Sequence, residues 1–332
     1  MYDLKEIKVI HLEPTRKCQA KCPMCPRRKQ GGKLNPDLDF SPEIRLEDFK
    51  KWFQPDFISQ LNRLYMCGNL GDPIIAADSL EIFEYLRENN PKMNLVMMTN
   101  GSARNQDWWE KLAKIKVRVV FALDGMEDTH ALYRVNTNWS QIIKNAQYFI
   151  NAGGRAEWAM LVFKHNEHQV EECRSLAKKM GFNIFHQKHS ARFQTEEFAV
   201  LNEEDEVTHI LNPTTQSINL REKIKTIDAT SPISCIAAKN KSLFVSADGT
   251  IVPCCWIGLE SKLANDPDSI EYNTRIGKPL SLHDYSLSEI FQNRFARKVE
   301  STWCNSALRV CSRKCGKVAT SGSQTVEKSK LK

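Results

Sequence analysis

Residues Cys18-Gln-Ala-Lys-Cys22-Pro-Met-Cys25 place three cysteines within eight positions, just after the short apolar run Ile7-Lys-Val-Ile-His-Leu12. The C-x3-C-x2-C spacing offers three thiolates to one metal centre from a single loop. A structural metal site is normally closed by four protein ligands, and this loop has no fourth ligand nearby. The spacing therefore predicts a metal centre with one open coordination position, where chemistry can take place.

Other kinds of cysteine site fit this loop less well. A zinc site needs a fourth Cys or His close by, and His11 belongs to the preceding strand candidate. A ferredoxin loop needs another cysteine three residues further on, and positions 26 to 34 contain none. Disulfides are disfavoured because the cysteine count of eleven is odd and no signal peptide precedes the loop. An iron-sulfur cluster with an open site is the favoured interpretation.

With this loop directly after a first strand, the sequence resembles the radical S-adenosylmethionine (SAM) enzymes. The resemblance implies a [4Fe-4S] cluster that Cys18, Cys22 and Cys25 bind as metal ligands, with SAM on the open iron. It implies that an electron from a donor such as flavodoxin or ferredoxin cleaves SAM. The resulting 5′-deoxyadenosyl radical then abstracts hydrogen from a substrate. We assign no catalytic acid or base.

A second motif supports this resemblance. In the family, a Gly-rich segment after the second strand binds the amino group of SAM, and Gly68-Asn-Leu-Gly-Asp-Pro73 stands at that position. Asn69 and Leu70 lengthen the segment, and Asp72 replaces the usual glutamate. The resemblance assigns cofactor contacts to Gly68, Asn69, Gly71, Asp72 and Pro73.

Strand and helix signals alternate through the first two thirds of the chain, which predicts a parallel α/β protein, here a partial (β/α)6 barrel like that of the family. The predicted strands are Ile7–Leu12, Arg63–Cys67, Asn94–Met98, Val117–Leu123, Arg155–Phe163 and Asn183–His186. The predicted helices are Asp78–Asn89, Asp107–Ile115, Ser140–Ala152 and Glu167–Met180, with Ser140, Asn166 and Gly181 as expected caps.

Active sites of βα barrels lie at the carboxyl ends of the strands, so the residues that follow each strand are of interest. Asn100, Asp124 and Asn166 each follow a predicted strand. The resemblance places Asn100 and Asp124 near the ribose and carboxylate of SAM, and Asn166 near its adenosine. A purely structural role as turn residues is an equally good interpretation for each. The site omits His165, His168, His186 and His189, since such histidines are as often hydrogen-bonded wall residues.

A second cysteine group lies near the C-terminus. Between Cys235 and Cys254, Asp248-Gly249 joins two apolar runs and predicts a hairpin that brings these cysteines together. This C-x13-G-x4-C arrangement resembles the opening of the SPASM/twitch extension of radical SAM enzymes, which houses auxiliary iron-sulfur clusters. Two clusters would need about eight ligands. This C-terminal group has only six cysteines, so one auxiliary [4Fe-4S] cluster is favoured.

The predicted auxiliary ligands are Cys235, Cys254, Cys311 and Cys315. Cys304 is the alternative to Cys311, and Cys255 would point away from the site if the strand continued through it. A structural zinc ion bound by four cysteines is the open alternative at this second group. Cys67 and Cys173 are expected to be packed thiols.

The chain of 332 residues divides into four predicted parts. Residues 1–190 would form the barrel, 191–232 a bridging or substrate-facing segment, 233–320 the auxiliary-cluster domain, and 321–332 a disordered polar tail. Within the bridge, the acidic run 196–206 is expected to be a solvated surface, with docking of a basic partner as the alternative.

Composition limits the partners. The net charge of +7 is spread along the chain, so no nucleic-acid partner is expected. No run of about eighteen apolar residues and no signal peptide occur, which predicts a cytoplasmic protein without a membrane partner. A peptide or protein substrate is the leading expectation. The alternatives are a small molecule, such as a sugar or cofactor precursor, and a noncatalytic electron-transfer or metal-storage protein. The open loop and the separate segment 68–73 argue against the noncatalytic alternative.

Overall fold

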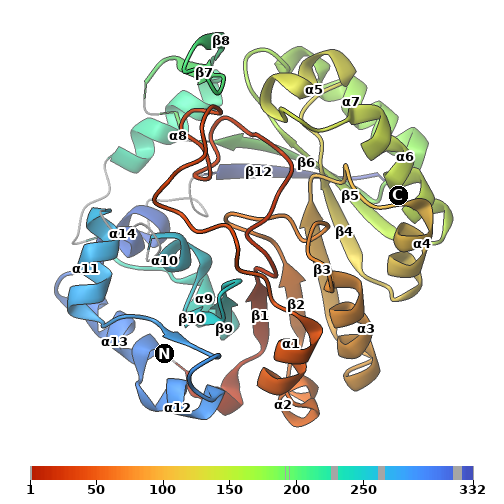
Figure 1. Cartoon of the computed structure of the whole chain (residues 1–332). Helices are drawn as coiled ribbons and strands as arrows, with labels where there is room; N and C mark the ends of the chain where they lie inside the picture. Colours follow the sequence, from red (N-terminus) through yellow and green to blue (C-terminus); the bar gives the residue numbers. More distant parts are fainter. Residues whose placement is uncertain are drawn as a thin grey trace. The chain divides into compact units, whose positions relative to one another are not determined.

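The computed structural model describes residues 2–190, 192–193, 195–225, 231–260, 266–316 and 324–331 (Figure 1). The chain forms two compact units. Unit 1 holds the described residues within 1–17, 37–96 and 227–319, and unit 2 holds those within 18–36, 97–226 and 320–332. The boundary between the units crosses strand β3 (Asn94–Thr99). None of the described helices is long and apolar enough to cross a membrane.

Unit 1 is built around β1 (Val9–Leu12), which pairs in parallel with β2 (Arg63–Met66) on one side and with β9 (Ser242–Val245) on the other. Strand β9 continues into the antiparallel partner β10 (Thr250–Val252), and the short β11 (Leu280–Ser281) pairs with β10. The predicted hairpin at Asp248-Gly249 is thereby confirmed. Gly249 has φ of +74°, a conformation that favours glycine at this turn.

The helices of unit 1 fall into two groups. The N-terminal group comprises η1 (Leu4–Glu6), α1 (Leu46–Trp52), α2 (Pro55–Ser59) and α3 (Ser79–Asn89). The C-terminal group comprises α9 (Ile236–Asn240), α10 (Cys255–Glu260), α11 (Pro267–Arg275), α12 (Leu287–Gln292), α13 (Phe295–Ser301), η3 (Thr302–Cys304) and α14 (Arg309–Cys315). An apolar cluster that includes Phe244, Tyr272, Val299 and Leu308 fills the space between β9, α11, α13 and α14.

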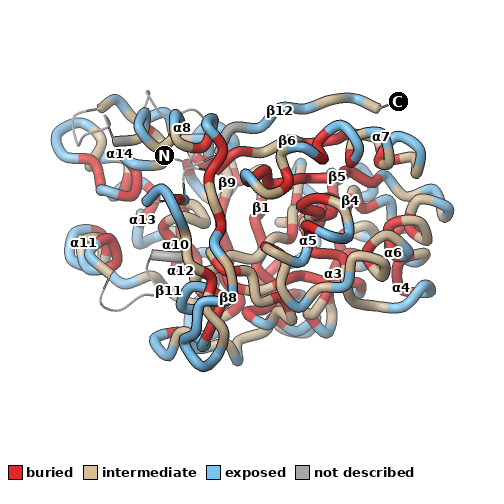
Figure 2. Tube along the Cα trace, turned by 90° about the horizontal axis from the view of Figure 1, so that it is seen from above, coloured by how far each residue is buried: buried red, intermediate tan, exposed pale blue. Residues whose placement is uncertain are grey.

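Unit 2 contains β4 (Arg118–Ala122), β5 (Arg155–Leu161) and β6 (Ile184–Ser190), which pair in parallel. Helices α4 (Gln106–Lys114), α5 (Glu127–Tyr133), α6 (Trp139–Asn151) and α7 (Val170–Met180) alternate with the strands, and η2 (Glu167–Gln169) leads into α7. Figure 2 shows β4 and β5 mostly buried, whereas α4, α6 and α7 alternate between buried and exposed residues. Each of the six predicted barrel strands is present, within a few residues of its predicted ends.

One predicted helix cap is wrong. Helix α6 begins at Trp139, and the side chain of Asn138 accepts the hydrogen bond from Gln141 N. Ser140 lies inside the first turn and donates to Glu127 instead. The C-cap at Gly181 is confirmed by its left-handed φ of +94°. Asn166 precedes η2 but makes no side-chain cap.

The bridging segment contains a hairpin and a helix, and part of the tail forms a strand. Strands β7 (Phe198–Leu201) and β8 (Val207–Leu211) form a hairpin, and α8 (Thr215–Lys225) follows. Strand β12 (Gln324–Lys330) pairs antiparallel with β6, from Gln324 opposite Ser190 to Lys330 opposite Ile184. The prediction of a disordered tail is wrong for 324–330, because these residues form backbone hydrogen bonds with β6. The polar composition of β12 suits a strand with mostly exposed side chains. Residues 321–323 and 332 lie outside the described residues.

Candidate metal centres

The first candidate centre is the cluster loop, residues 18–25 in unit 2. Its turn is closed by a hydrogen bond from Cys25 N to Cys22 O (3.0 Å), and the Arg27 guanidinium donates to Cys18 O (2.9 Å). Lys21 N donates to Val135 O (2.8 Å), which ties the loop to the segment after α5. Burial raises the pKa of the Cys22 and Cys25 thiols, so both stay protonated without a metal to hold the thiolate.

Two side chains donate hydrogen bonds to the sulfurs of this loop. Asn100 Nδ2 lies 3.7 Å from Cys18 Sγ, and Arg134 Nη1 lies 3.8 Å from Cys22 Sγ. Gln19 Nε2 in turn donates to Asn100 Oδ1 at 2.8 Å and fixes that amide. Donors to sulfur stabilise thiolates and tune the metal they bind, so the surroundings suit a thiolate-bound centre.

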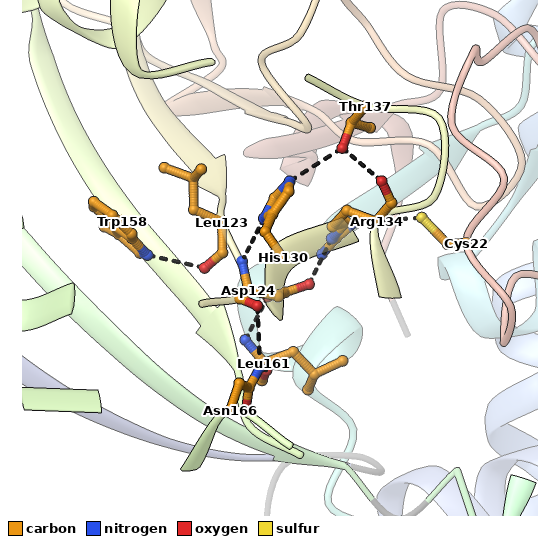
Figure 3. A network of polar contacts seen from close by, with 9 residues as sticks. All are labelled: Cys22, Leu123, Asp124, His130, Arg134, Thr137, Trp158, Leu161 and Asn166. Atoms are coloured by element: carbon orange, nitrogen blue, oxygen red, sulfur yellow. Dashed lines mark hydrogen bonds and ion pairs between the residues drawn. The ribbon is translucent and has the colours of Figure 1, made fainter. Parts of the chain in front are cut away.

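Asp124 connects this loop to the strands of unit 2 (Figure 3). Its side chain is fully buried, and its oxygens accept hydrogen bonds from Leu161 N (2.6 Å) and Arg134 Nε (2.5 Å). Burial lowers the pKa of Arg134, but Asp124 and Cys22 raise it by more, so the guanidinium stays charged. Asp124 therefore holds Arg134 toward Cys22. Sequence reasoning missed Arg134, which lies in no motif.

Asn166 and His130 belong to the same network of polar contacts (Figure 3). The buried Asn166 amide accepts from Phe163 N (2.8 Å) and donates to the carbonyls of Asp124 and Leu161 (3.1 Å each). Asp124 N donates to His130 Nδ1 at 3.1 Å. Burial lowers the pKa of His130 to about 4, so its ring is neutral at pH 7. These side chains fasten the ends of β4 and β5 to each other.

The acidic run of the bridging segment contacts the cluster loop and the residues that follow it. Glu203 pairs with Lys21 (2.7 Å) and Arg28 (3.4 Å), and Asp205 pairs with Lys33. The backbone of Leu201 also donates to the carbonyl of residue 30 (2.9 Å). Both acids remain exposed, as predicted for a solvated surface, and the hairpin β7–β8 brings them to basic residues of 21–33.

The segment 68–73 lies in unit 1, where its glycines permit close backbone approach. A Cβ on Gly68 would lie 2.1 Å from Gly71 O, and a Cβ on Gly71 would lie 1.8 Å from Thr15 O. Asp72 N donates to Lys17 O (2.9 Å), and Asp72 Oδ1 accepts from Ile74 N (3.1 Å). The segment is thus a tight turn packed on the residues that follow β1.

Glu13, a residue that the sequence analysis passed over, supports this turn. Its carboxylate is 2% exposed and accepts hydrogen bonds from Leu70 N (2.7 Å) and Gly71 N (3.4 Å). Burial raises the pKa of Glu13, and these backbone donors oppose that rise. Asn69 Nδ2 donates to the backbone carbonyl of Cys255 (2.7 Å). Glu13 could have been identified from the sequence as an acidic residue directly after a buried strand.

The second candidate centre is the auxiliary cavity, a pocket in unit 1. Its lining includes Cys235, Cys254, Cys311 and Cys315 together with Trp303 and Lys314. The four predicted ligands thus surround one space, which matches the four thiolates that bind a cubane cluster. Within the part of the chain that the structure describes, no three Cys, His, Asp or Glu side chains converge on the position of a single ion.

The two other cysteines of this group stand outside the cavity lining. Cys304 is exposed at the end of η3. Cys255 is the first residue of α10, because β10 already ends at Val252. The condition that the strand continues through Cys255 is therefore not met, and this thiol is nevertheless absent from the lining as expected.

The cavity thiols differ in their acidity. A hydrogen bond shared with Cys315 lowers the pKa of Cys235 to about 6 and raises that of Cys315. Burial raises the pKa of Cys254 to about 11 and also raises that of Cys311. Ligation of these thiols would therefore release protons as the thiolates form.

Comparison with known proteins gives two family matches. Residues 12–177 match the radical SAM superfamily, and residues 235–316 match the SPASM iron-sulfur cluster-binding domain. No curated protein sequence matches the chain.

Several solved structures share the fold. Streptococcus suis SuiB bound to S-adenosylmethionine is 15% identical with a TM-score of 0.56, covering 94% of this chain and 73% of that one. SuiB bound to its precursor peptide SuiA is 14% identical with a TM-score of 0.53, covering 86% of this chain and 64% of that one. The anSMEcpe structure with AdoMet and the Cp18Cys peptide is 15% identical with a TM-score of 0.56, covering 93% and 89%.

These likenesses confirm the predicted fold class, a partial (β/α)6 barrel with a cysteine-rich C-terminal region. The first family match spans half of the chain and includes the cluster loop with all three of its cysteines. The second begins at Cys235 and includes all four cysteines of the auxiliary cavity. The chain therefore belongs to the radical SAM superfamily and carries a SPASM iron-sulfur domain.

Proposed function

We propose that this protein cleaves SAM reductively and directs the resulting 5′-deoxyadenosyl radical to a hydrogen atom of a peptide or protein side chain. The observation that carries the proposal is the cluster loop, with its C-x3-C-x2-C cysteines inside the region that matches the superfamily. The hydrogen-bond donors Asn100 and Arg134 at two of the sulfurs support it.

The first cluster would be a [4Fe-4S] cubane on Cys18, Cys22 and Cys25, and bound there it supplies the electron that cleaves SAM. The chain's own residues hold and tune it. Arg134 offsets the negative charge of the Cys22 thiolate, and the buried Asp124 keeps the guanidinium in place.

The remaining predicted residues divide into two roles. Gly68, Asn69, Gly71, Asp72 and Pro73 would bind SAM from a tight turn whose close backbone contacts require glycine at 68 and 71. We assign Asn100, Asp124 and Asn166 to positioning, since their side chains already bond to the cluster loop or to the ends of β4 and β5.

A peptide or protein substrate is supported by two of the similar structures, since SuiB binds the precursor peptide SuiA and anSMEcpe binds the Cp18Cys peptide. One auxiliary [4Fe-4S] cluster on Cys235, Cys254, Cys311 and Cys315 completes the proposal, in preference to zinc, because the match there is to an iron-sulfur domain. An external flavodoxin or ferredoxin would supply electrons, in the reducing cytoplasm that such clusters require.

The test is SAM cleavage by protein reconstituted with iron and sulfide without oxygen and reduced with dithionite. We expect 5′-deoxyadenosine from the wild type and from Cys304→Ala, whose thiol is exposed and outside the auxiliary cavity. Cys22→Ala should form none and should lose about four irons. Deuterium transfer from a labelled candidate peptide into 5′-deoxyadenosine would identify the substrate class. Absence of cleavage with any peptide, together with unchanged iron in Cys22→Ala, would refute the proposal.

A further inference from the structure

A buried donor in the auxiliary cavity lacks an acceptor. Trp303 lines the cavity with the four cysteines, and its indole Nε1 is buried with no hydrogen-bond partner among the described residues. Native proteins rarely leave a buried N–H unsatisfied, and such a group calls for a partner that the protein atoms do not supply. A sulfur of a bound cluster is an acceptor of the right kind for this position.

Cys311 is one of the thiols that line the cavity together with Trp303. A Cys311 thiolate would offer the unpartnered indole N–H an acceptor. Thiolate sulfur is the charged form and accepts a stronger hydrogen bond than thiol sulfur does. The hydrogen bond from the Trp303 N–H is therefore strongest when Cys311 is a metal-bound thiolate.

Lys314 brings a positive charge to the lining of the same cavity. Lys314 Nζ lies 4.2 Å from the ring centroid of Trp256, and both residues line the cavity. The indole face attracts the ammonium group and helps to keep it at the cavity lining. Because apolar side chains such as Ile257, Val299 and Val310 line the cavity, this charge acts on it with less screening than it would have in water.

We propose that Trp303 and Lys314 raise the reduction potential of the auxiliary cluster, Trp303 by donating its N–H to the Cys311 thiolate or a cluster sulfide and Lys314 by its charge. Reduction adds one negative charge to the cluster, so a donor and a cation stabilise the reduced form more than the oxidised form. The inference rests on the proposed function, because it presupposes an iron-sulfur cluster in this cavity.

The test is a redox titration followed by electron paramagnetic resonance (EPR). Protein with Cys18, Cys22 and Cys25 all replaced by alanine would carry the auxiliary cluster alone. In that background Trp303→Phe and Lys314→Met should each lower the reduction equilibrium constant by roughly threefold to tenfold, where tenfold equals about 59 mV for one electron.

Two matched controls separate this effect from general disturbance. Trp52→Phe removes another buried indole N–H that has no partner in the described part of the chain, from a residue that is not part of the cavity lining. Lys298→Met removes a surface charge on α13 that is also outside that lining. Both should leave the potential unchanged.

Unchanged potentials in Trp303→Phe and Lys314→Met would overturn the inference while leaving the cluster itself established. Should Trp303→Phe fail to load iron, pulsed EPR of the parent protein with ¹⁵N-indole tryptophan replaces it. A ¹⁵N coupling that persists in Trp256→Phe supports the inference, and no coupling overturns it. If further replacement of Cys235 and Cys254 removes no iron, the auxiliary part of the proposed function fails, and the inference fails with it.

Discussion

Replacing Asp124 with asparagine should destabilise unit 2 and weaken the cluster loop. The Asp124 side chain has no exposure, and its carboxylate pairs with Arg134 Nε at 2.5 Å. Asparagine keeps an oxygen for Leu161 N but removes the charge that faces the guanidinium. Removal of one partner from a buried pair costs about 3–5 kcal/mol. Arg134 is 21% exposed and can regain some water, so we expect about 3 kcal/mol, roughly a hundredfold in the unfolding constant.

The assay is guanidinium unfolding of cluster-free protein under reducing conditions, with the free energy taken from the midpoint and slope. Asp128→Asn, a change at an exposed residue of α5, is the matched control and should cost at most about 0.5 kcal/mol. Reconstituted Asp124→Asn should also bind less iron, since Arg134 is no longer held toward Cys22. A free energy of unfolding within 0.5 kcal/mol of wild type, with full iron content, would refute this account of Asp124.

Two further predictions concern charge and backbone space. Burial alone would raise the pKa of Glu157, but hydrogen bonds from His186 and from an arginine of β4 hold this pKa at about 2, below the ordinary 4.5. This stabilisation is present above pH 4.5 and is lost as the pH falls toward 2. Over that range the free energy of unfolding of the wild type should fall by up to about 3 kcal/mol more than that of Glu157→Gln. Unfolding measured at a series of pH values checks this. Gly71→Ala should abolish SAM binding in equilibrium dialysis, because its Cβ would lie 1.8 Å from Thr15 O; Gly153→Ala, with φ of +85° but no atom within 4 Å, controls for backbone strain and should still bind SAM.

Local patterns predicted much of the architecture, because they act through neighbours in the sequence. The six strands followed from short apolar runs, and Asp248-Gly249 specified the hairpin that brings Cys235 and Cys254 to one cavity. The choice of Cys311 over Cys304 as the predicted ligand agrees with the cavity lining. In each case the spacing of residue types along the chain was enough to make the prediction.

Contacts between distant residues could not be predicted in this way. Glu203 pairs with Lys21 across 182 positions, and no pattern near either residue indicates its partner. Strand β12 reads as a polar tail, because an edge strand with exposed side chains lacks an apolar signature. Arg134 likewise carries no motif, since its role depends on a buried carboxylate and a sulfur that the fold brings to it.

Asp124 shows why position at a strand end does not decide function. A polar residue there can contact a cofactor or brace the structure, and the sequence supports both. In the structure each carboxylate oxygen already has a partner, Leu161 N or Arg134 Nε. A direct contact between this carboxylate and SAM would need a donor at a side chain that has no exposure and already accepts two short hydrogen bonds. Bracing uses the contacts that the carboxylate already makes, and we therefore propose that Asp124 acts on the cluster loop through Arg134.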